Sequence, residues 1–516
     1  MKKLLALVLA VCLLTSITAS LALADEKTYD KKVTISWATI AATAGYDYSH
    51  GDDLASYWTD KFNFEWDVIP LDWSSWAETL RVWIASGDMP DMVTWNFDYS
   101  ELASWVDQGL VYELPEGWKE RWPGVAAATD AAIGTQVEEM LGGTYMLCRP
   151  TYMTNFPEGY PVTECFGVFI RSDWAEAVGF ELKDYYTLTE LEEYVRLVLE
   201  QNPGNVENLV GISMSTTQIF NLYMRTQWTN LNSFYIGEDG QYHWGCQDEE
   251  VLPALQHLKD AYTEGLIHPE YYLLDNSEAN DLFRVNGTAA VCGWNLMPAN
   301  WNSNTNEVAE NLGAENAVHA AWIIAEDGKF HGQVNDNYWT CALFSPDIDE
   351  EVFERVMDIM EYSTTAEAST LVNLGFEGVD YTYDADGNFV SLLEAGTDIN
   401  SKYKCQMPAY TNLLVLSDDF GLANPNFPEK FRDACIRYYK ERVELSDETT
   451  LVYKDPTAMF WVSNAKTRID ALSLDTEFSQ IMLQDGDLET NLNTWINDKL
   501  PLANQVISEL NAQLSK

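Results

Sequence analysis

The 516-residue chain is poor in basic side chains and in histidine. It carries 30 Lys and Arg against 81 Asp and Glu, a formal net charge of −51, and only 6 His. A surface this negative repels phosphate backbones and anionic lipid headgroups, so we expect no nucleic-acid partner and no binding to a membrane surface. The acidic residues are spread along the chain, which indicates a strongly solvated surface. The same charge argues against a strongly anionic ligand.

Motifs for metal binding and for nucleophilic catalysis are absent as well. The sequence contains no C-x-x-C, H-x-H or H-E-x-x-H, so no transition-metal site is predicted. It also lacks G-x-S-x-G and any Cys/His arrangement with catalytic spacing. Residues 384–388, Asp-Ala-Asp-Gly-Asn, suggest a calcium loop, but the glycine comes too early for an EF-hand. We therefore expect no metal, no cofactor and no enzymatic activity.

The cysteines do not form a pattern typical of a disulfide-stabilised protein. Eight are present, and those that follow Cys12 are odd in number and irregularly spaced. Most have apolar neighbours, as in Ala290-Val291-Cys292, and free cysteine is commonly buried. This is not a disulfide framework, although the sequence allows a single disulfide.

A long apolar run occurs only at the N-terminus. Lys2 and Lys3 precede an apolar stretch over residues 4–14, and residues 22–24, Ala-Leu-Ala, match an A-x-A cleavage site. This pattern predicts a secretory signal peptide over 1–24, whose apolar part is too short to span a bilayer. Cys12 lacks the small preceding residue of a lipoprotein signal, so lipid anchoring is not expected. We expect an exported protein that is extracellular, at the cell surface or periplasmic.

Strand and helix patterns alternate in the first part of the mature chain. Residues 33–37 alternate apolar and polar side chains as a half-buried strand does. A capping box at residues 75–78 predicts the start of a helix, which Gly87 ends in the left-handed conformation and Pro90 cannot continue. Residues 92–95 form the next short strand. This order predicts a mostly parallel sheet flanked by helices, in which ligands bind beyond the carboxyl ends of the strands.

Aromatic residues beside amides or charges, at predicted strand ends, are the candidate ligand contacts. Trp95, Asn96 and Asp98 lie at the end of one such strand, although a structural cap would also explain them. Aromatic faces suit the C–H surfaces of sugars, whose hydroxyl groups need polar partners nearby. The full set of candidate ligand-binding residues is Trp95, Asn96, Asp98, Trp294, Asn295, Trp339, Trp228, Arg225, Trp73 and Tyr46.

Four stretches are similar to those of a known family. Residues 85–93 (ASGDMPDMV) resemble an S-G-D-x-P-D signature, residues 262–270 (YTEGLIHPE) a Y-x-E-G-L-I-x-P-E segment, and residues 283–291 (FRVNGTAAV) an F-x-x-G-x-A-A-M strand whose final Met is Val291 here. In this order they resemble family 1 extracellular solute-binding proteins, the maltose-binding-protein-like receptors of ATP-binding-cassette importers. Residues 375–382 (GFEGVDYT) resemble a long-chain subgroup often tied to oligosaccharide uptake.

The resemblance implies an α/β, two-lobed periplasmic-binding-protein-like fold. Each lobe would be a mostly parallel sheet flanked by helices, and crossing strands near residues 165, 290 and 340 would form the hinge. We place the domain limits after the signal peptide as follows: an N-terminal lobe in 25–165 and 293–338, and a C-terminal lobe with extra helices in 166–292 and 339–516.

The resemblance also implies a function. A monomeric receptor would capture an oligosaccharide in the interlobe cleft by hinge closure and deliver it to the membrane permease subunits of an importer, without catalysis. Two alternatives stay open. One is the same fold binding a peptide or another non-sugar solute. The other is a secreted glycoside hydrolase or lyase, for which the sequence singles out no pair of acids among the 81.

Overall fold

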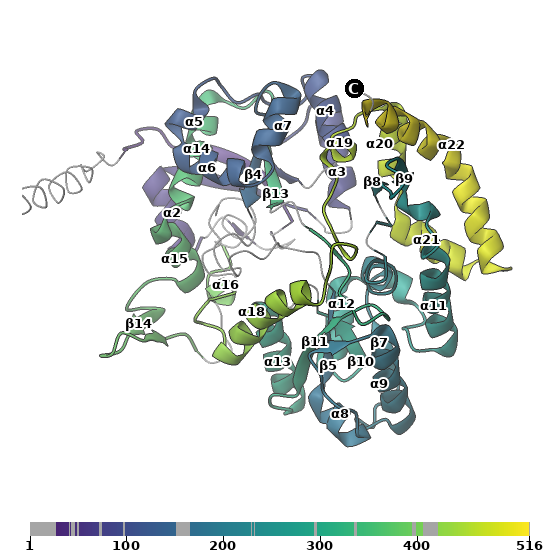
Figure 1. Ribbon diagram of the computed structural model, residues 1–516. Helices are drawn as coiled ribbons and strands as arrows, with labels where there is room; N and C mark the ends of the chain where they lie inside the picture. The colour runs from purple at the N-terminus through teal and green to yellow at the C-terminus, as the bar shows by residue number, and fades with distance from the viewer. Residues whose placement is uncertain are drawn as a thin grey trace, which may run out of the picture.

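Two five-stranded sheets, each flanked by helices, form two lobes (Figure 1). This two-lobed α/β architecture confirms the expected fold class. The structure is a computed structural model, and it describes residues 27–40, 42, 47–48, 51–71, 75–95, 99–150, 166–228, 230–231, 233–293, 297–334, 338–394, 399–405 and 422–514.

The sheet of the first lobe has the strand order β2-β1-β3-β13-β4. Its central strand β1 is parallel to β2 and β3, whereas β13 is antiparallel to both β3 and β4. The strands are β1 (Val33–Thr39), β2 (Phe64–Pro70), β3 (Met92–Trp95), β4 (Leu147–Pro150) and β13 (Tyr338–Phe344). The helices on this sheet are α2 (Asp53–Phe62), α3 (Trp76–Ser86), α4 (Tyr99–Asp107), α5 (Trp118–Arg121), α6 (Pro123–Ala131), α7 (Gly134–Leu141), α14 (Glu350–Ser363), α15 (Ala366–Leu374) and α16 (Ile399–Lys402). A separate hairpin, β14 (Tyr381–Tyr383) and β15 (Phe389–Ser391), projects from this lobe (Figure 1).

The sheet of the second lobe has the order β6-β11-β5-β10-β7. Strand β5 is antiparallel to β10 and β11, whereas β10 pairs in parallel with β7 and β11 with β6. The strands are β5 (Gly167–Arg171), β6 (Tyr185–Tyr186), β7 (Val210–Ser213), β10 (Thr288–Cys292) and β11 (Val318–Ile323). The other elements are α8 (Ser172–Val178), α9 (Leu188–Gln201), α10 (Thr216–Phe220), the π-helix η2 (Asn221–Arg225), β8 (Phe234–Ile236), β9 (Tyr242–Trp244), η3 (Gly245–Gln247), α11 (Val251–Glu264), η4 (Tyr271–Leu273), α12 (Asn276–Arg284), α13 (Pro298–Leu312), β12 (Gly332–Gln333), α18 (Glu429–Glu444) and β16 (Leu451–Val452).

The strand pairing agrees with one detail of the expected architecture and corrects another. Each sheet is mostly parallel, with a single strand running against the others, β13 in the first sheet and β5 in the second. The expected lobe limits differ from the pairing, since β11 belongs to the second sheet and β13 to the first. The chain stays in the second lobe after β10 because α13 packs against α12, α18 and β11. It therefore returns to the first sheet only between β12 and β13, and β10 is not a crossing strand.

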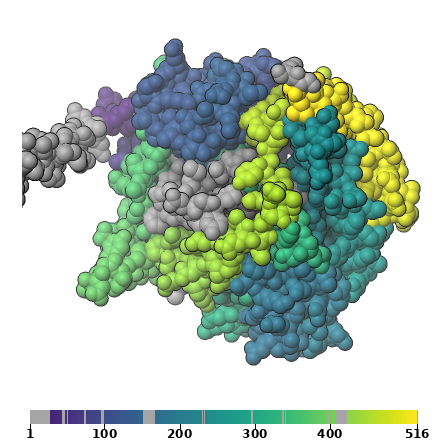
Figure 2. All heavy atoms as spheres, viewed as in Figure 1, coloured from purple at the N-terminus to yellow at the C-terminus, as the bar shows by residue number. Residues whose placement is uncertain are grey.

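The C-terminal helices extend the second lobe. They are α19 (Pro456–Met459), α20 (Asn464–Asp470), α21 (Leu474–Leu483) and α22 (Leu488–Leu514), and α22 runs along the outer side of this lobe (Figures 1 and 2). Ala465, Phe478 and Leu510 are buried in the core of the second lobe. Phe460 instead joins the core of the first lobe, where its ring meets that of Tyr99 edge-on at 5.0 Å between centroids. The C-terminal segment thus contacts both lobes.

The turn between α3 and β3 explains the S-G-D-x-P-D signature. Gly87 ends α3 with a φ of 76°, as predicted, since this left-handed conformation favours glycine. The Asp91 carboxylate accepts hydrogen bonds from the Ser36 amide (2.7 Å) and hydroxyl (2.6 Å), which ties the start of β3 to β1. The capping box expected at Ser75 is not formed, because the ψ of −1° at Ser75 is not the extended value of an N-cap.

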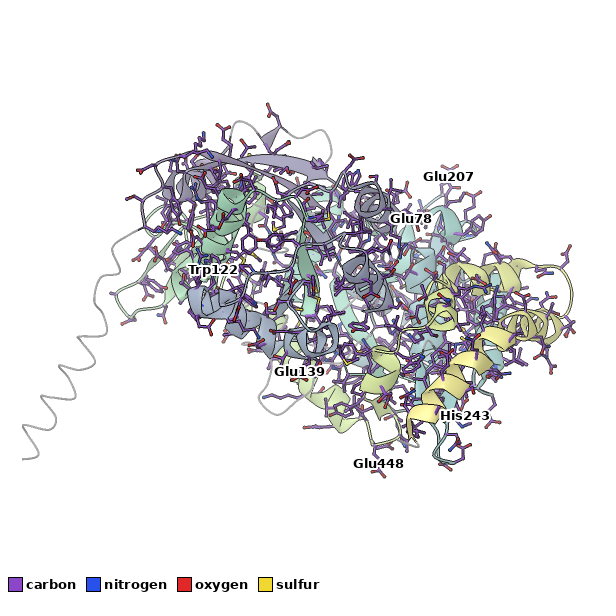
Figure 3. The ribbon with its side chains drawn as sticks, turned by 90° about the horizontal axis from the view of Figure 1, so that it is seen from above. Glu78, Trp122, Glu139, Glu207, His243 and Glu448 are labelled. Carbon is purple, nitrogen blue, oxygen red and sulfur yellow. The ribbon has the colours of Figure 1, made fainter. Side chains whose placement is uncertain are left out.

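Acidic side chains lie at the surface, and the described cysteines lie in the interior. Glu78, Glu139, Glu207 and Glu448, from different elements of both lobes, are exposed to solvent (Figure 3). The six cysteines that the structure describes are buried. Those on β4 and β13 face each other, with the Sγ atoms of Cys148 and Cys341 3.6 Å apart. No helix in the described ranges combines the length and hydropathy needed to cross a membrane.

Candidate ligand-binding site

The ten candidate residues differ in how far the structure describes them. Trp95 and Trp339 lie in β3 and β13, and their backbones but not their side chains are described. Arg225 and Trp228 are described in full. The remaining candidates lie outside the described residues: Tyr46, Trp73, Asn96, Asp98, Trp294 and Asn295.

The pairing of β3 with β13 places the backbones of Trp95 and Trp339 near each other. Trp95 is the last residue of β3 and pairs with Cys341 of the antiparallel β13. Trp339 lies two positions before Cys341 in β13, at the same end of the sheet as Trp95. Because β1 and β3 are parallel, this is the sheet edge at which both strands end, where ligands of open α/β sheets bind.

The two candidates of the second lobe, Arg225 and Trp228, lie close together in the chain, and Arg225 lies near a connection between the lobes. Arg225 is the last residue of η2, and its guanidinium lies 6.0 Å from the ring of Phe166, just before β5. A few residues further on, Ser233 accepts a hydrogen bond from Gln333 Nε2 (3.1 Å) at the end of β12. A π-helical turn is rare and is frequently found at functional sites. Arg225 and Ser233 thus each lie beside a connection between the lobes.

Trp228 is held by a carboxylate. Its Nε1 donates to Asp248 Oδ2 (3.0 Å), and the hydroxyl of Tyr235 donates to the same oxygen (2.9 Å). The indole is partly buried against the core of the second lobe. Burial raises the pKa of Asp248 to about 6, although the two hydrogen bonds act in the opposite direction.

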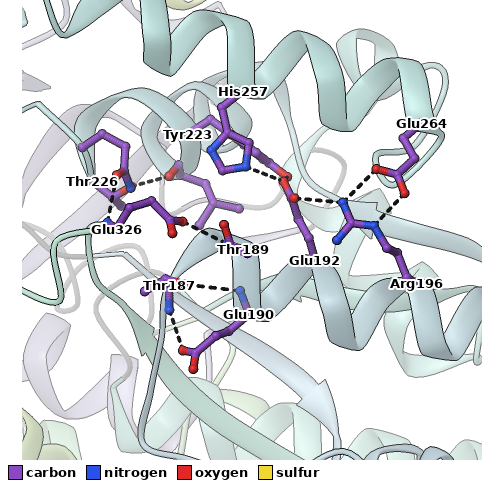
Figure 4. Close-up of polar contacts among 12 residues, drawn as sticks. Thr187, Thr189, Glu190, Glu192, Arg196, Tyr223, Thr226, His257, Glu264 and Glu326 are labelled. Atoms are coloured by element: carbon purple, nitrogen blue, oxygen red, sulfur yellow. Dashed lines mark hydrogen bonds and ion pairs between the residues drawn. The ribbon is translucent and has the colours of Figure 1, made fainter.

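The buried carboxylate of Glu192 connects η2 to α9 and α11 (Figure 4). Glu192 on α9 accepts hydrogen bonds from the Tyr223 hydroxyl of η2 (3.2 Å) and from His257 Nε2 of α11 (3.0 Å). Arg196 lies 3.3 Å from Glu192 and is also bound by both oxygens of Glu264, at 2.6 and 2.7 Å. The hydrogen bond to Glu192 raises the pKa of His257. This network fixes the position of the helix that carries Arg225.

Further polar groups at the strand ends were not predicted. Ser213 is the last residue of β7, and Ser100 lies in the first turn of α4, which follows β3. Their hydroxyl oxygens and Asn230 Oδ1 are buried and have no hydrogen-bond partner within the described ranges. Buried polar atoms without partners cost roughly 1–3 kcal/mol each, so we regard them as candidate contacts for a hydroxylated solute. A serine directly at a strand end is the sequence signal that would have identified Ser213.

Two other regions are less suited to hold a ligand. A surface depression beside α18 is lined by Lys183, Asp184, Tyr185, Glu441, Glu444 and Leu445. Three of these side chains already have hydrogen-bond partners, since Tyr185 donates to Glu441 (2.5 Å) and Asp184 accepts from the Tyr438 hydroxyl (3.0 Å). In the turn that resembles a calcium loop, the Asp384 carboxylate already accepts hydrogen bonds from the Asp386 and Asn388 amides, at 2.9 and 2.8 Å.

Comparisons with known proteins place the chain in a family. A model of bacterial extracellular solute-binding proteins matches residues 51–368. Lipoprotein LipO of Bacillus subtilis (strain 168) is 23% identical over 335 residues, and the alignment spans 63% of this chain and 63% of that relative.

Solved structures of similar fold cover nearly the whole chain. Alginate-binding protein AlgQ2 without calcium ion has a TM-score of 0.66 at 15% identity, covering 95% of this chain and 99% of its own. The FusA EF-hand mutant of S. pneumoniae with fructo-nystose has a TM-score of 0.63 at 13% identity, with coverages of 94% and 100%. NgtS of Streptococcus pneumoniae with Man5GlcNAc has a TM-score of 0.58 at 14% identity, with coverages of 94% and 98%. These likenesses agree with the two-lobed fold, and because the family model matches more than half of the sequence, the chain belongs to the bacterial extracellular solute-binding protein family.

Proposed function

We propose that this solute-binding protein captures a neutral oligosaccharide between its lobes and delivers it to the membrane subunits of an ATP-binding-cassette importer. The proposal is supported by the positions of Arg225 and Ser233, each beside a connection between the lobes, and by the nearby Trp228, whose indole is held by a carboxylate. An indole face next to fixed polar groups suits a sugar ring. In this proposal the lobes close around the solute, with Trp95 and Trp339 contributing from the first lobe.

Charge and relatives both support the choice of a neutral sugar. The net charge of −51 disfavours an anionic chain, even though one structural neighbour is an alginate-binding protein. Other neighbours were solved with fructo-nystose and Man5GlcNAc, which carry no charge. We also propose that residues 1–24, which lie outside the described residues, direct export, and that the mature protein acts as a monomer.

Isothermal titration calorimetry tests the ligand class directly. We expect heat of binding with at least one neutral oligosaccharide, fructo-nystose and Man5GlcNAc being the first to try, and none with alginate oligosaccharides. Mass spectrometry of ligand that copurifies with the protein would identify the natural solute. Binding of peptides with no response to any sugar would overturn the oligosaccharide proposal and favour a non-sugar solute.

Replacing Trp228 with alanine is expected to weaken sugar binding about tenfold to a hundredfold, about 1.4–2.7 kcal/mol, because the stacking face is lost. The matched control is Trp461→Ala, which removes another partly buried indole whose Nε1 donates to a carboxylate, that of Glu509 (2.9 Å). Calorimetry measures both affinities, and thermal unfolding measures both stabilities. Equal losses of affinity in the two variants would mean that Trp228 acts through the fold alone.

Trp95→Ala is expected to weaken binding without unfolding the protein, because we place Trp95 at the end of β3 as a ligand contact. Circular dichroism and calorimetry on the same preparation check the two parts of this expectation. Binding like that of the wild type, or collapse of the fold, would remove Trp95 from the site.

A further inference from the structure

One carboxylate oxygen of Asp248 holds two aromatic side chains. Oδ2 accepts hydrogen bonds from Trp228, three residues after the end of η2, and from Tyr235 on β8. The backbone of Trp228 is fixed separately, because its amide donates to the Met224 carbonyl of η2 (2.9 Å). Asp248 itself follows η3 and is half-buried.

The bond to Asp248 determines how the indole is rotated. Tryptophan has one polar atom, the Nε1–H donor, so a single acceptor fixes the angle of the ring about its side-chain bonds. Tyr235 holds the acceptor in place in turn, since β8 is paired with β9 over three residues and the Tyr235 hydroxyl shares the same oxygen. Both bonds are charge-assisted while the carboxylate is ionised, and such bonds are roughly twice as strong as neutral ones.

The groups around Asp248 set the pH at which its carboxyl group gains a proton. Burial is the largest cause of its raised pKa, about 6, and the like charge of Glu250 adds to it. The hydrogen bonds from Tyr235 and Trp228 and the charge of His243 lower the pKa. His243 is paired with Asp239 at 2.9 Å and its ring lies 5.9 Å from that of Tyr235. Cys246, fully buried beside this group, has a raised pKa and stays neutral.

We propose that Asp248 is a positioning residue, whose ionised carboxylate orients Trp228 and whose protonation in mild acid weakens solute binding. The orientation of Trp228 follows from the contacts of this chain alone, whereas the effect on binding rests on the proposed function. The carboxyl group gains a proton as the pH falls through about 6, and the two bonds then become neutral. The indole is consequently held less firmly at low pH.

Fluorine NMR of protein labelled with fluorotryptophan tests the positioning role without any ligand. Trp228→Phe assigns the Trp228 resonance by its disappearance. We expect this resonance to shift between about pH 8 and about pH 5 with a midpoint near 6 in the wild type, and to be pH-independent in Asp248→Asn. Asparagine keeps the shape and one acceptor oxygen, so the variant is expected to fold. His243→Gln should keep the transition but move its midpoint to a higher pH, since the charge of His243 lowers the pKa of Asp248.

Calorimetry with fructo-nystose and Man5GlcNAc tests the consequence for binding. In the wild type we expect affinity to fall about threefold to tenfold over the same pH range, and in Asp248→Asn to be nearly constant at the lower value. A Trp228 resonance that does not titrate, or that titrates equally in Asp248→Asn, overturns the inference whatever the sugars do. A resonance that titrates as expected, with no heat from either sugar, leaves the positioning role intact and counts against the proposed function.

Discussion

Replacing Asp380 with alanine is expected to lower the free energy of unfolding by about 3 kcal/mol, the lower end of the range for breaking a buried charged pair. The carboxylate is completely buried at the base of the β14–β15 hairpin. It accepts hydrogen bonds from the Phe376 amide (2.7 Å) and the Tyr403 hydroxyl (2.8 Å) and forms an ion pair with Lys402. The loss is at the lower end because the Lys402 side chain is 35% exposed and can be hydrated.

Urea unfolding followed by circular dichroism measures this loss. Asp386→Ala is the matched control, because Asp386 lies in the same hairpin, is exposed, and contributes only its backbone amide to the turn. We expect the control to change stability by less than about 0.5 kcal/mol. Equal effects of the two substitutions would contradict a structural role for the buried carboxylate.

The same contacts explain why residues 375–382 resemble a family motif. A Cβ on Gly375 would lie 2.3 Å from Asp380 Oδ2, and the φ of 78° at this position also favours glycine. Gly378 has a φ of 80°, and its amide donates to the Tyr381 carbonyl (2.7 Å). The motif therefore encodes a buried carboxylate and the turn around it. The resemblance identified the stretch from sequence alone. The reason for the buried Asp380 appears only in the structure, because its partners Lys402 and Tyr403 lie outside the motif.

Local patterns in the sequence predicted the elements of the first sheet but not how all strands assemble. Alternation over residues 33–37 and the apolar run at 92–95 became β1 and β3, because local periodicity reports which side chains are buried. The lobe to which β11 and β13 belong could not be predicted, since both are short apolar runs that fit either sheet. Their placement depends on pairing with strands more than a hundred residues away, such as β5 and β3.

The sequence predicted some residues of the candidate site and missed others. Arg225 and Trp228 were predicted because aromatic and polar residues adjoin in the sequence. The structure places Arg225 beside Phe166, just before β5, and ties Trp228 to Asp248. Asp248 and Glu192 were not predicted, because nothing local distinguishes them among 81 acidic residues. Their roles come from burial and from partners on other elements, which only tertiary structure supplies.

Replacing Glu192 with alanine is expected to lower the free energy of unfolding by about 3–5 kcal/mol, because one partner of a buried charged network is removed. Glu192 is 5% exposed and accepts hydrogen bonds from Tyr223 and His257. The fully buried Tyr223 hydroxyl would lose its acceptor, and η2 would lose its connection to α9. Arg196 is less affected, because it keeps both bonds to Glu264.

The neighbouring Glu193 provides the control for this prediction. It is exposed to solvent on α9, so Glu193→Ala should change the free energy of unfolding by less than about 0.5 kcal/mol. Urea titrations of both variants and the wild type give the comparison. If Glu192→Ala proved as stable as Glu193→Ala, the network would not support η2.

A pH series separates the charged pair from simple packing. Because the folded state raises the pKa of His257, its contribution is fully present below the unfolded value, about 6.5, and is lost as the pH rises through the folded pKa. Glu192→Gln keeps the side-chain shape but not the charge, so its deficit in unfolding free energy should be larger below about pH 6.5 than well above it. A deficit independent of pH would mean that His257 takes no part as a cation. In that case η2 would be held by the hydrogen bond to Tyr223 alone.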